Sequence, residues 1–253
     1  MLTSQRKKLI LEQLATDGQV VAKRLSEVFE VSEDTIRRDL RELAGEGLLQ
    51  RVHGGALPAS SAIAPYAQRT LIETRGKRDI AQTAATMILP GQIVVIDGGT
   101  TSAELIRCLP LTLAATVVTH SPSVALGLID HPLIEVIIIG GRLYKHSIVA
   151  VGAAAVEAIS HIRADIYFMG VTGAHPTAGL STGDMEEAYI KRALSACAAE
   201  TVVLASSDKI NAASRFAIGE ITLAHTIIVE RDTDVALTRP FEQAGVTIVR
   251  ADA

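Results

Sequence analysis

The stretch SEDTIRRDLRELAGEGLLQRVHGGA, residues 32–56, decides the fold of the N-terminal part of this 253-residue chain. Placed on a helix, Ile36, Leu40 and Leu43 fall within about 60° of one another and form a narrow apolar stripe. The opposite side carries polar and basic side chains, which are those of Thr35, Arg37, Arg38, Arg41 and Glu42. Such a helix packs its apolar face against a small core and exposes its basic face, which suits binding to a polyanion.

Two further helices are predicted before this one. The first runs from Ser4 to about Ala15 and is ended by Asp17-Gly18, and the second runs from Val20 to Phe29. Ser32 is a good N-cap for the third helix, whose acidic first turn suits the helix dipole. We expect the second helix to bury Val21, Leu25, Val28 and Phe29. Two helices joined by a short turn, the second one basic and exposed, are typical of a helix-turn-helix.

The residues after the basic helix predict a wing. Beyond Gly45 and Gly47, residues 48–55 suit a two-stranded ribbon whose Arg51 and His53 contact phosphate or a minor groove. Residues 1–56 carry nine basic and nine acidic side chains, so their net charge does not argue for DNA binding. The position of the arginines on the exposed side of the helix does argue for DNA binding. The alternative interpretation is a three-helix bundle with ordinary surface arginines.

The same residues follow a longer pattern, V-S-x-x-T-I-R-R-D-L-x-x-L and then G-x-L-x-R-x-H-G-G-A, between Val31 and Ala56. It resembles the helix-turn-helix of the DeoR family of bacterial sugar-responsive transcription regulators. The resemblance implies a winged helix-turn-helix DNA-binding domain over residues 1–56, a linker over 57–75 and an effector-binding α/β domain over 76–253. We expect the linker to end in a helix around Gln68–Glu73. The expected DNA contacts are Thr35, Arg37, Arg38, Arg41, Arg51 and His53.

The composition restricts where the protein works and what it binds. Apolar residues make up 48% of the chain, which allows a substantial core. The most apolar region, residues 124–141, includes charged side chains and falls short of the ~18 uncharged residues that a membrane span needs. The N-terminus lacks the apolar core of a signal peptide, so we expect a cytoplasmic protein with no membrane partner. A net charge of −4 confines nucleic-acid contact to a local surface, and 3% aromatic residues disfavour recognition of single strands.

From Lys77 onward, short apolar runs alternate with helical patterns. The runs are residues 93–96, 115–118, 136–139, 166–169, 202–204, 227–229 and 246–249, and the helices are 80–88, 102–109, 121–129, 152–159 and 185–200. Because the runs are rich in β-branched residues and apolar on both faces, they suit strands covered by helices on both sides. The sequence therefore predicts an α/β domain with a mostly parallel sheet.

Polar residues follow five consecutive predicted strands. The segments are Asp97–Ser102, Thr119–Ser121, Gly140–Arg142, Gly170–Gly173 and Ser206–Lys209. Ligands of parallel α/β sheets bind outside the carboxyl ends of the strands, so these segments predict a small-molecule pocket. In the first of them, two glycines and two threonines precede a helix start, which suits a phosphate group. No nucleotide-binding glycine motif occurs in the chain.

Several single residues allow two interpretations. Glu187 and Lys191, four apart on a helix, suit either a surface pair or a functional couple, and Lys209 suits either a solvated turn or a counter-charge for phosphate. His120, His146 and His175 have no partner at metal-ligand spacing and are expected to be polar lining or surface. Cys108 and Cys197 are expected to be reduced and inside helices. No metal or cofactor is expected.

The C-terminal part also resembles the DeoR-family effector domain, whose fold is similar to that of ribose-phosphate isomerases. In two places the chain departs from the family pattern, with His120 where Asn is usual and Ser206 where Asp is usual. Because His changes size and donor pattern, the identity of the sugar does not carry over. The expected effector-binding residues are Asp97, Gly98, Gly99, Thr100, Thr101, Ser102, Thr119, His120, Ser121, Gly140, Gly141, Gly170, Glu187, Lys191 and Lys209.

These features together predict a non-enzymatic transcription regulator. We expect a repressor of a sugar or polyol operon that binds double-stranded operator DNA as a homo-oligomer and is released by a phosphorylated sugar. One alternative is a sugar-phosphate isomerase with Glu187 or Asp184 as base and Lys191 or Lys209 stabilising an enediolate. The basic helix argues against it, because an isomerase has no use for exposed arginines there. The other alternative, an architectural DNA binder, would need no pocket.

Overall fold

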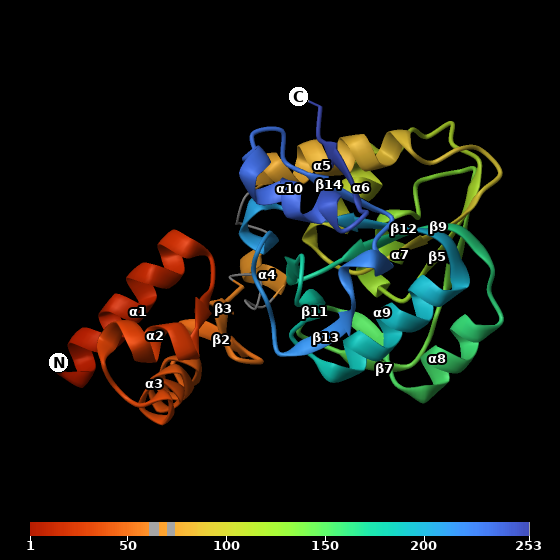
Figure 1. The fold of residues 1–253 in the computed structure, drawn as a ribbon. Helices are drawn as coiled ribbons and strands as arrows, with labels where there is room; N and C mark the ends of the chain where they lie inside the picture. Colours follow the sequence, from red (N-terminus) through yellow and green to blue (C-terminus); the bar gives the residue numbers. More distant parts are fainter. Residues whose placement is uncertain (61–65, 70–73, 253) are drawn as a thin grey trace.

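The N-terminal part packs helices on a small antiparallel sheet (Figure 1). This computed structural model describes residues 1–60, 66–69 and 74–252. The first 60 residues form α1 (Thr3–Asp17), β1 (Val20–Val21), α2 (Ala22–Phe29), α3 (Glu33–Gly45), β2 (Leu49–Val52) and β3 (Gly55–Pro58). The predicted helices and wing are present. Ile36, Leu40 and Leu43 are buried in the core of this part, as the stripe on α3 predicts.

Local chemistry sets the ends of these helices. The Ser32 Oγ accepts a hydrogen bond from the Thr35 N–H (3.2 Å), which confirms the predicted N-cap of α3. At the end of α1, Gly18 adopts φ +70° and its N–H donates to the Leu14 carbonyl (2.9 Å). Glycine reaches this left-handed conformation without steric cost, so the Asp17-Gly18 stop is confirmed.

The prediction of a helix starting at Val20 is wrong. Val20 and Val21 form β1, which pairs with Ala56 and Gly55 of β3 and turns the wing into a three-stranded sheet. A Cβ on Gly55 would lie 1.9 Å from the Val20 carbonyl oxygen, so glycine is what permits this pairing. The helix starts at Ala22 instead, and Val21 on β1 and Val28 on α2 are both exposed rather than buried as predicted. The pairing partner lies more than 30 residues away, so local periodicity did not reveal it.

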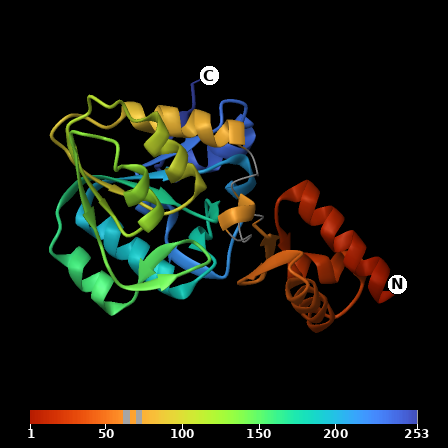
Figure 2. The ribbon, with the colours of Figure 1, turned by 180° about the vertical axis from the view of Figure 1, so that it is seen from behind.

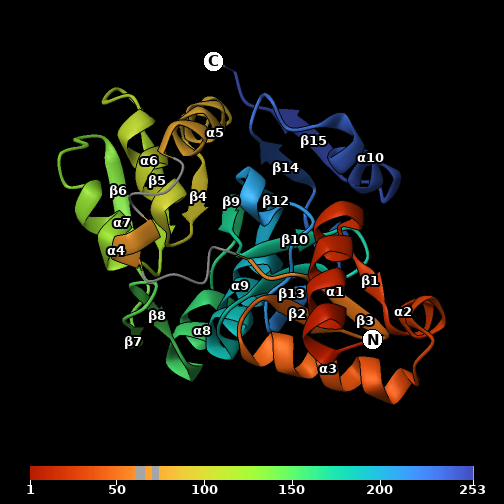
Figure 3. The ribbon, with the colours of Figure 1, turned by 90° about the vertical axis from the view of Figure 1, so that its left-hand side faces the viewer.

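The C-terminal part is an α/β domain built on a parallel sheet. Seven strands in the described residues pair in the order β15-β14-β12-β9-β4-β5-β6, and Figure 3 displays them across the view in this order. Every neighbouring pair is parallel. The strands are β4 (Ile93–Ile96), β5 (Ala115–Thr119), β6 (Ile134–Ile138), β9 (Ala164–Gly170), β12 (Ala198–Leu204), β14 (Thr226–Val229) and β15 (Thr247–Arg250). The predicted fold class is confirmed.

Helices cover both faces of this sheet and enclose two apolar cores (Figure 2). The alternation along β4 shows the division, because Val94 and Ile96 belong to one core and Val95 to the other. One face is covered by α5 (Thr74–Thr86), α6 (Thr100–Cys108) and α7 (Pro122–Gly127), and the other by α8 (Ala153–Ser160), α9 (Met185–Cys197) and α10 (Val235–Gln243). The helix predicted to reach residue 200 ends at Cys197, because residues 198–200 pair with β9.

Smaller elements lie beside the main sheet. They are the pair β7 (Arg142–Tyr144) and β8 (Val149–Val151), the sheet of β10 (Gly173–His175), β11 (Gly179–Thr182) and β13 (Phe216–Gly219), and the 3-10 helices η2 (Ser207–Lys209) and η3 (Ile221–Leu223). At the edge strand β6, Ile137 and Ile138 are exposed, so the expectation of strands covered on both faces fails there. An edge strand has a neighbour on one side only.

The segment between the two parts is held against the C-terminal part. Its short helix α4 (Tyr66–Arg69) starts where the Tyr66 N–H donates to the His146 carbonyl (3.2 Å). At its end, the Lys77 Nζ donates to the Arg69 carbonyl (2.8 Å). The predicted linker helix therefore begins earlier than Gln68, and its residues 70–73 lie outside the described residues. Nearer the wing, Ala59 forms a parallel bridge with Ala213.

Candidate functional site

The exposed face of α3 carries the arginines that the sequence indicated. Arg37, Arg38 and Arg41 are all exposed, and together with Asp34 and Thr35 they line a shallow surface hollow. The Arg37 guanidinium pairs with Glu33 (2.7 Å) on the same helix. The other predicted DNA contacts, Arg51 and His53, are exposed on the wing. The structure thus presents a basic helix and a basic wing on the surface of the N-terminal part.

A buried ion pair supports this helix from behind. The Arg6 guanidinium on α1 donates through Nε and Nη2 to the two carboxylate oxygens of Asp39 on α3. The two side chains are 5% and 0% exposed, so the pair is removed from water. Sequence reasoning missed it, although on a helical wheel Asp39 lies beside the apolar stripe rather than opposite to it. Because the pair joins α1 to α3, it fixes the orientation of the basic helix.

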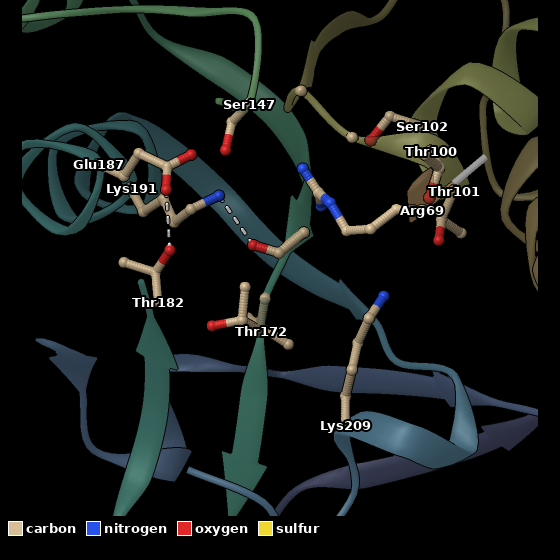
Figure 4. Close-up of a pocket in the computed structure, with 14 residues that line it drawn as sticks. Arg69, Thr100, Thr101, Ser102, Ser147, Thr172, Thr182, Glu187, Lys191 and Lys209 are labelled. Carbon is tan, nitrogen blue, oxygen red and sulfur yellow. Dashed lines mark hydrogen bonds between the residues drawn. The ribbon is translucent and has the colours of Figure 1, made fainter. Parts of the chain in front are cut away.

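A pocket opens at the carboxyl ends of β4 and β9, as the strand-end rule predicts. Its walls come from segments far apart in the chain, and Figure 4 shows their side chains converging. The lining residues are Arg69, Gly98, Gly99, Thr100, Thr101, Ser102, Ser147, Gly170, Val171, Thr172, Thr182, Glu187, Lys191 and Lys209. Nine of the predicted effector-binding residues are among them.

The start of α6 forms the wall that suits an anion. Gly99 precedes the helix with φ +139°, and the first-turn amides of a helix have no intrahelical acceptor. The hydroxyl oxygens of Thr101 and Ser102 are buried and have no hydrogen-bond partner in the described residues. Buried donors without acceptors are unfavourable, and a phosphate group at the helix start would supply acceptors.

Lys209 faces this wall from η2. It is 7% exposed, so the interpretation as a solvated turn is wrong. The pKa of Lys209 is lowered to about 8, chiefly by burial and in part by the nearby cations of Lys77, Arg69 and Lys191, against the attraction of Asp208. The Lys209 ammonium donates no side-chain hydrogen bond within the described part of the chain. A cation in this state favours an incoming anion.

This lowered pKa predicts pH-dependent binding of phosphate. Below about pH 8 Lys209 is charged before the anion arrives, whereas above it each binding event must first return a proton to Lys209. We therefore expect phosphate affinity, measured by calorimetry, to fall by up to about tenfold per pH unit above pH 8. Phosphate monoesters are already dianionic there, since their second pKa is about 6. If the phosphate affinity of a Lys209→Met protein falls equally steeply above pH 8, Lys209 is not the cause of the pH dependence.

Asp97 lies behind the pocket and organises it. Its carboxylate is fully buried and accepts hydrogen bonds from the Lys191 Nζ, the His120 Nε2 (2.7 Å) and the Tyr167 hydroxyl (3.1 Å). The Gly170 N–H also donates to it (2.9 Å). Burial alone would raise the pKa of Asp97, but the Lys191 ammonium and the His120 hydrogen bond outweigh it and hold the pKa well below its usual range.

His120 is a structural partner of Asp97 and not polar lining. The ring is fully buried, with Nδ1 opposite the Ala150 carbonyl (2.9 Å) and Nε2 opposite the Asp97 carboxylate. The expectation of polar lining or surface is therefore wrong for His120. The sequence could not show that His120 contacts Asp97, because the two residues are 23 positions apart and on different strand ends.

Glu187 and Lys191 are buried and do not form the surface pair that their spacing allowed. The Lys191 Nζ is engaged by Asp97 and by the Gly170 carbonyl (2.8 Å). The Glu187 Oε2 accepts a hydrogen bond from the Thr182 hydroxyl (3.1 Å), and its carboxylate faces the pocket (Figure 4). Carboxylate and hydroxyl groups at this end of the pocket suit the hydroxyl groups of a ligand.

Six predicted effector-binding residues do not line the pocket. Four of them, Asp97, Thr119, His120 and Ser121, are fully buried and are absent from the pocket lining. The remaining two, Gly140 and Gly141, are exposed beyond the edge strand β6. Sequence reasoning missed the lining residues Arg69, Ser147, Val171, Thr172 and Thr182. Thr172 lies within a strand-end segment that the sequence had marked, whereas Arg69 lies in the supposed linker and gave no signal.

Within the described part of the chain, neither a metal site nor a membrane span is found. The described residues contain no cluster of three or more His, Cys, Asp or Glu side chains that could hold a metal ion. The two cysteines are free thiols and are the last residues of α6 and α9. No helix in residues 1–60, 66–69 and 74–252 is long and apolar enough to cross a membrane.

Comparison with protein families matches both parts of the chain. Residues 6–62 match the DeoR-like helix-turn-helix domain, and residues 72–231 match the DeoR C terminal sensor domain. The chain belongs to the DeoR family. This DeoR-family protein is therefore a transcription regulator with a DNA-binding domain followed by a sensor domain.

Curated relatives match this DeoR-family regulator over nearly its whole length. The HTH-type transcriptional regulator GlpR of Haloferax volcanii is 34% identical over 98% of this chain and 98% of its own. The glycerol-3-phosphate regulon repressor of Escherichia coli strain K12 is 31% identical over 94% of this chain and 94% of its own.

Solved structures give more distant matches. The full-length sorbitol operon regulator SorC from Klebsiella pneumoniae aligns with a TM-score of 0.42 and 11% identity over 97% of this chain and 96% of its own. Ribose 5-phosphate isomerase A from Methanocaldococcus jannaschii aligns with a TM-score of 0.39 and 18% identity, over 53% of this chain and 52% of the isomerase.

Proposed function

We propose that this DeoR-family regulator represses a sugar or polyol catabolic operon and that a phosphorylated sugar or polyol releases it from DNA. In this proposal residues 1–56 bind the operator, residues 57–75 connect, and residues 76–253 bind the effector. The observation that carries it is the pocket at the start of α6, where the buried hydroxyls of Thr101 and Ser102 have no hydrogen-bond partner among the described residues and share the pocket with cationic side chains. The similarity to a glycerol-3-phosphate regulon repressor supports a phosphorylated ligand.

The two ends of the pocket match the two ends of such a ligand. Thr100, Ser102 and Lys209 lie at the end that suits phosphate, whereas Glu187 and Thr182 lie at the opposite end and suit hydroxyl groups (Figure 4). A ligand with a phosphate but no hydroxyl groups would leave the Glu187 end unmatched. This arrangement favours a short sugar or polyol phosphate over inorganic phosphate alone.

The effector proposal is tested by melting the full-length protein with a panel of sugar and polyol phosphates and their unphosphorylated forms. A ligand at about a hundred times its dissociation constant stabilises the fold by about 2.7 kcal/mol, which melting detects. We expect the phosphorylated form to act and the unphosphorylated form to do far less. The active compound should also release the protein from DNA of the operon's upstream region. If the phosphorylated and unphosphorylated forms raise the melting temperature equally, the phosphate group does not contribute to binding.

The pocket is proposed to bind its effector without chemical turnover. Lys191 is engaged by Asp97 and the Gly170 carbonyl, so it is not free to stabilise an enediolate. The test is to incubate each sugar phosphate with the protein and follow isomerisation by NMR. Isomerisation by the wild type that Glu187→Gln abolishes would favour the isomerase alternative instead.

Operator binding is proposed to use α3 of two or more copies of the chain. A single helix-turn-helix buries little surface, and two-fold recognition of half-sites overcomes this. The oligomeric state is tested by light scattering of the free protein and of its complex with DNA. A monomer that binds a single half-site with full affinity would contradict the proposal.

Removing an arginine from the exposed face of α3 should weaken DNA binding. Arg38 is exposed, and no acidic side chain pairs with it in the described residues. We expect Arg38→Ala to lose about 1–3 kcal/mol of operator binding in a fluorescence-anisotropy titration. The matched control is Arg239→Ala, an exposed arginine on α10 that should leave affinity unchanged. If Arg37→Ala and Arg38→Ala both bind as tightly as wild type, α3 is not the recognition helix.

A further inference from the structure

Arg69 is a pocket residue that no pattern in the sequence indicated. It ends α4 in the segment that connects the two parts, and its guanidinium points into the middle of the pocket (Figure 4). Its Nε and Nη2 atoms are removed from solvent and have no hydrogen-bond partner in the described residues. Burial also lowers the pKa of Arg69, although an arginine keeps its charge at neutral pH. Buried N–H donors without acceptors are unfavourable, and an anion in the pocket would supply acceptors for these two nitrogens.

The unpaired donors of the pocket come from separate elements and face the same space. Arg69 extends from α4, Thr101 and Ser102 from the start of α6, and Lys209 from η2. Thr101 and Ser102 are only 5% and 1% exposed, and their hydroxyl oxygens also lack hydrogen-bond partners within the described residues. A phosphate group carries enough oxygens to accept from all of these donors. The guanidinium fork can bind two phosphate oxygens at once.

We propose that Arg69 is a direct ligand of the effector's phosphate group, so that helix α4 between the two parts contributes a residue to the effector site. This inference rests on the proposed function and adds the residue through which the effector acts on the segment that leads to the DNA-binding part.

The contacts of this segment provide the physical connection. The wing strand β3 ends at Pro58, whose carbonyl accepts a hydrogen bond from the Ala213 N–H (3.3 Å), four residues after Lys209. Further along, Tyr66 binds the carbonyl of His146, next to the lining residue Ser147. The described residues between the two parts are therefore attached at two places, each within four residues in sequence of a pocket-lining residue. An anion held by Arg69 and Lys209 together favours one arrangement of both attachments, and through them one placement of the wing.

The test compares full-length wild type, Arg69→Gln and Arg75→Gln, with inorganic phosphate as the probe and sodium chloride added to keep the ionic strength constant. Arg75 is the matched control because its side chain is 92% exposed and lies outside the pocket. We expect wild type and Arg75→Gln to bind phosphate equally, within twofold, and Arg69→Gln to bind it at least tenfold more weakly. Equal affinities in all three proteins would overturn the proposal.

Two further measurements separate a ligand from a merely structural arginine. Without phosphate, Arg69→Gln should melt at or near the wild-type temperature, because the substitution removes two buried N–H donors that have no acceptor in the described residues and gives up a contact with the Tyr66 ring (5.9 Å). A structural role instead predicts a lower melting temperature with an unchanged phosphate response. The variant Arg69→Lys, which keeps the charge and loses the fork, should bind phosphate with intermediate affinity. If it binds no better than Arg69→Gln, the contact is not with an anion.

The last measurement concerns release of DNA. A labelled duplex from the region upstream of the chain's own gene is bound by each protein, and phosphate is added at ten times the wild-type dissociation constant. We expect release of wild type and Arg75→Gln and retention of Arg69→Gln. If wild type responds and Arg69→Gln responds equally, Arg69 is not the sensing residue while the proposed function stands. If wild type responds neither to phosphate nor to any sugar phosphate in melting, both proposals fail.

Discussion

Replacing Asp97 with alanine is expected to lower the free energy of unfolding by about 3–5 kcal/mol, because it leaves buried charge unpaired. Asp97 is fully buried, and its carboxylate is the common partner of the Lys191 ammonium and the His120 ring. The substitution also leaves the Tyr167 hydroxyl without this acceptor. The measurement is urea unfolding of the full-length protein followed by circular dichroism. The control is Asp130→Ala, an exposed carboxylate whose loss should change stability by less than about 0.5 kcal/mol.

The same carboxylate predicts how stability depends on pH. The pKa of Asp97 is lower in the folded protein than the ~3.9 of an unfolded aspartate, so the folded state favours the ionised form. This contribution is fully present above about pH 4 and is lost as the pH falls below it. Wild type should therefore lose stability on acidification more steeply than Asp97→Ala. Parallel acid profiles for the two proteins, or an alanine variant as stable as wild type, would show that the carboxylate does not hold the pocket together.

The second large effect is expected at the ion pair between α1 and α3. Asp39→Ala leaves the Arg6 guanidinium buried without a counter-charge and should destabilise the DNA-binding part by about 3–5 kcal/mol. Because Asp39 is on the inner side of α3, operator affinity should fall even though no exposed arginine is changed. Urea unfolding and operator titration measure the two effects. An Asp39→Ala protein with wild-type stability would mean that the pair contributes nothing to the packing of α1 on α3.

A double variant distinguishes the cost of an unpaired charge from the value of the pair. Replacing both partners, as Arg6→Met with Asp39→Leu, leaves no buried charge and fills a similar volume with apolar groups. We expect this protein to be more stable than either single variant, and its deviation from additivity gives the coupling energy. If the double variant is less stable than both single variants, the apolar pair does not replace the ion pair, and each charged side chain stabilises the fold through contacts other than the pair.

Local patterns were sufficient wherever the cause of the structure is local. The apolar stripe of Ile36, Leu40 and Leu43 predicts both the helix and its buried face, because helical periodicity depends on neighbouring residues alone. The Ser32 cap and the Gly18 stop follow from the chemistry of single residues at helix ends. The strand-end segments around Gly99 and Gly170 predict a pocket, because parallel strands bring their carboxyl ends to one edge of the sheet.

Only the tertiary structure decided which side chains meet, because the partners are distant in the sequence. Asp97 and Lys191 are 94 residues apart. No sequence pattern near either residue shows that the Asp97 carboxylate pairs with the Lys191 ammonium behind the pocket. The pairing of Val20 with Ala56 likewise replaces a plausible helical turn by a strand, because β3 supplies the hydrogen-bond partners. Arg69 is the clearest case. The sequence around Arg69 predicts a linker. The packing of α4 on the C-terminal part places the Arg69 guanidinium in the pocket.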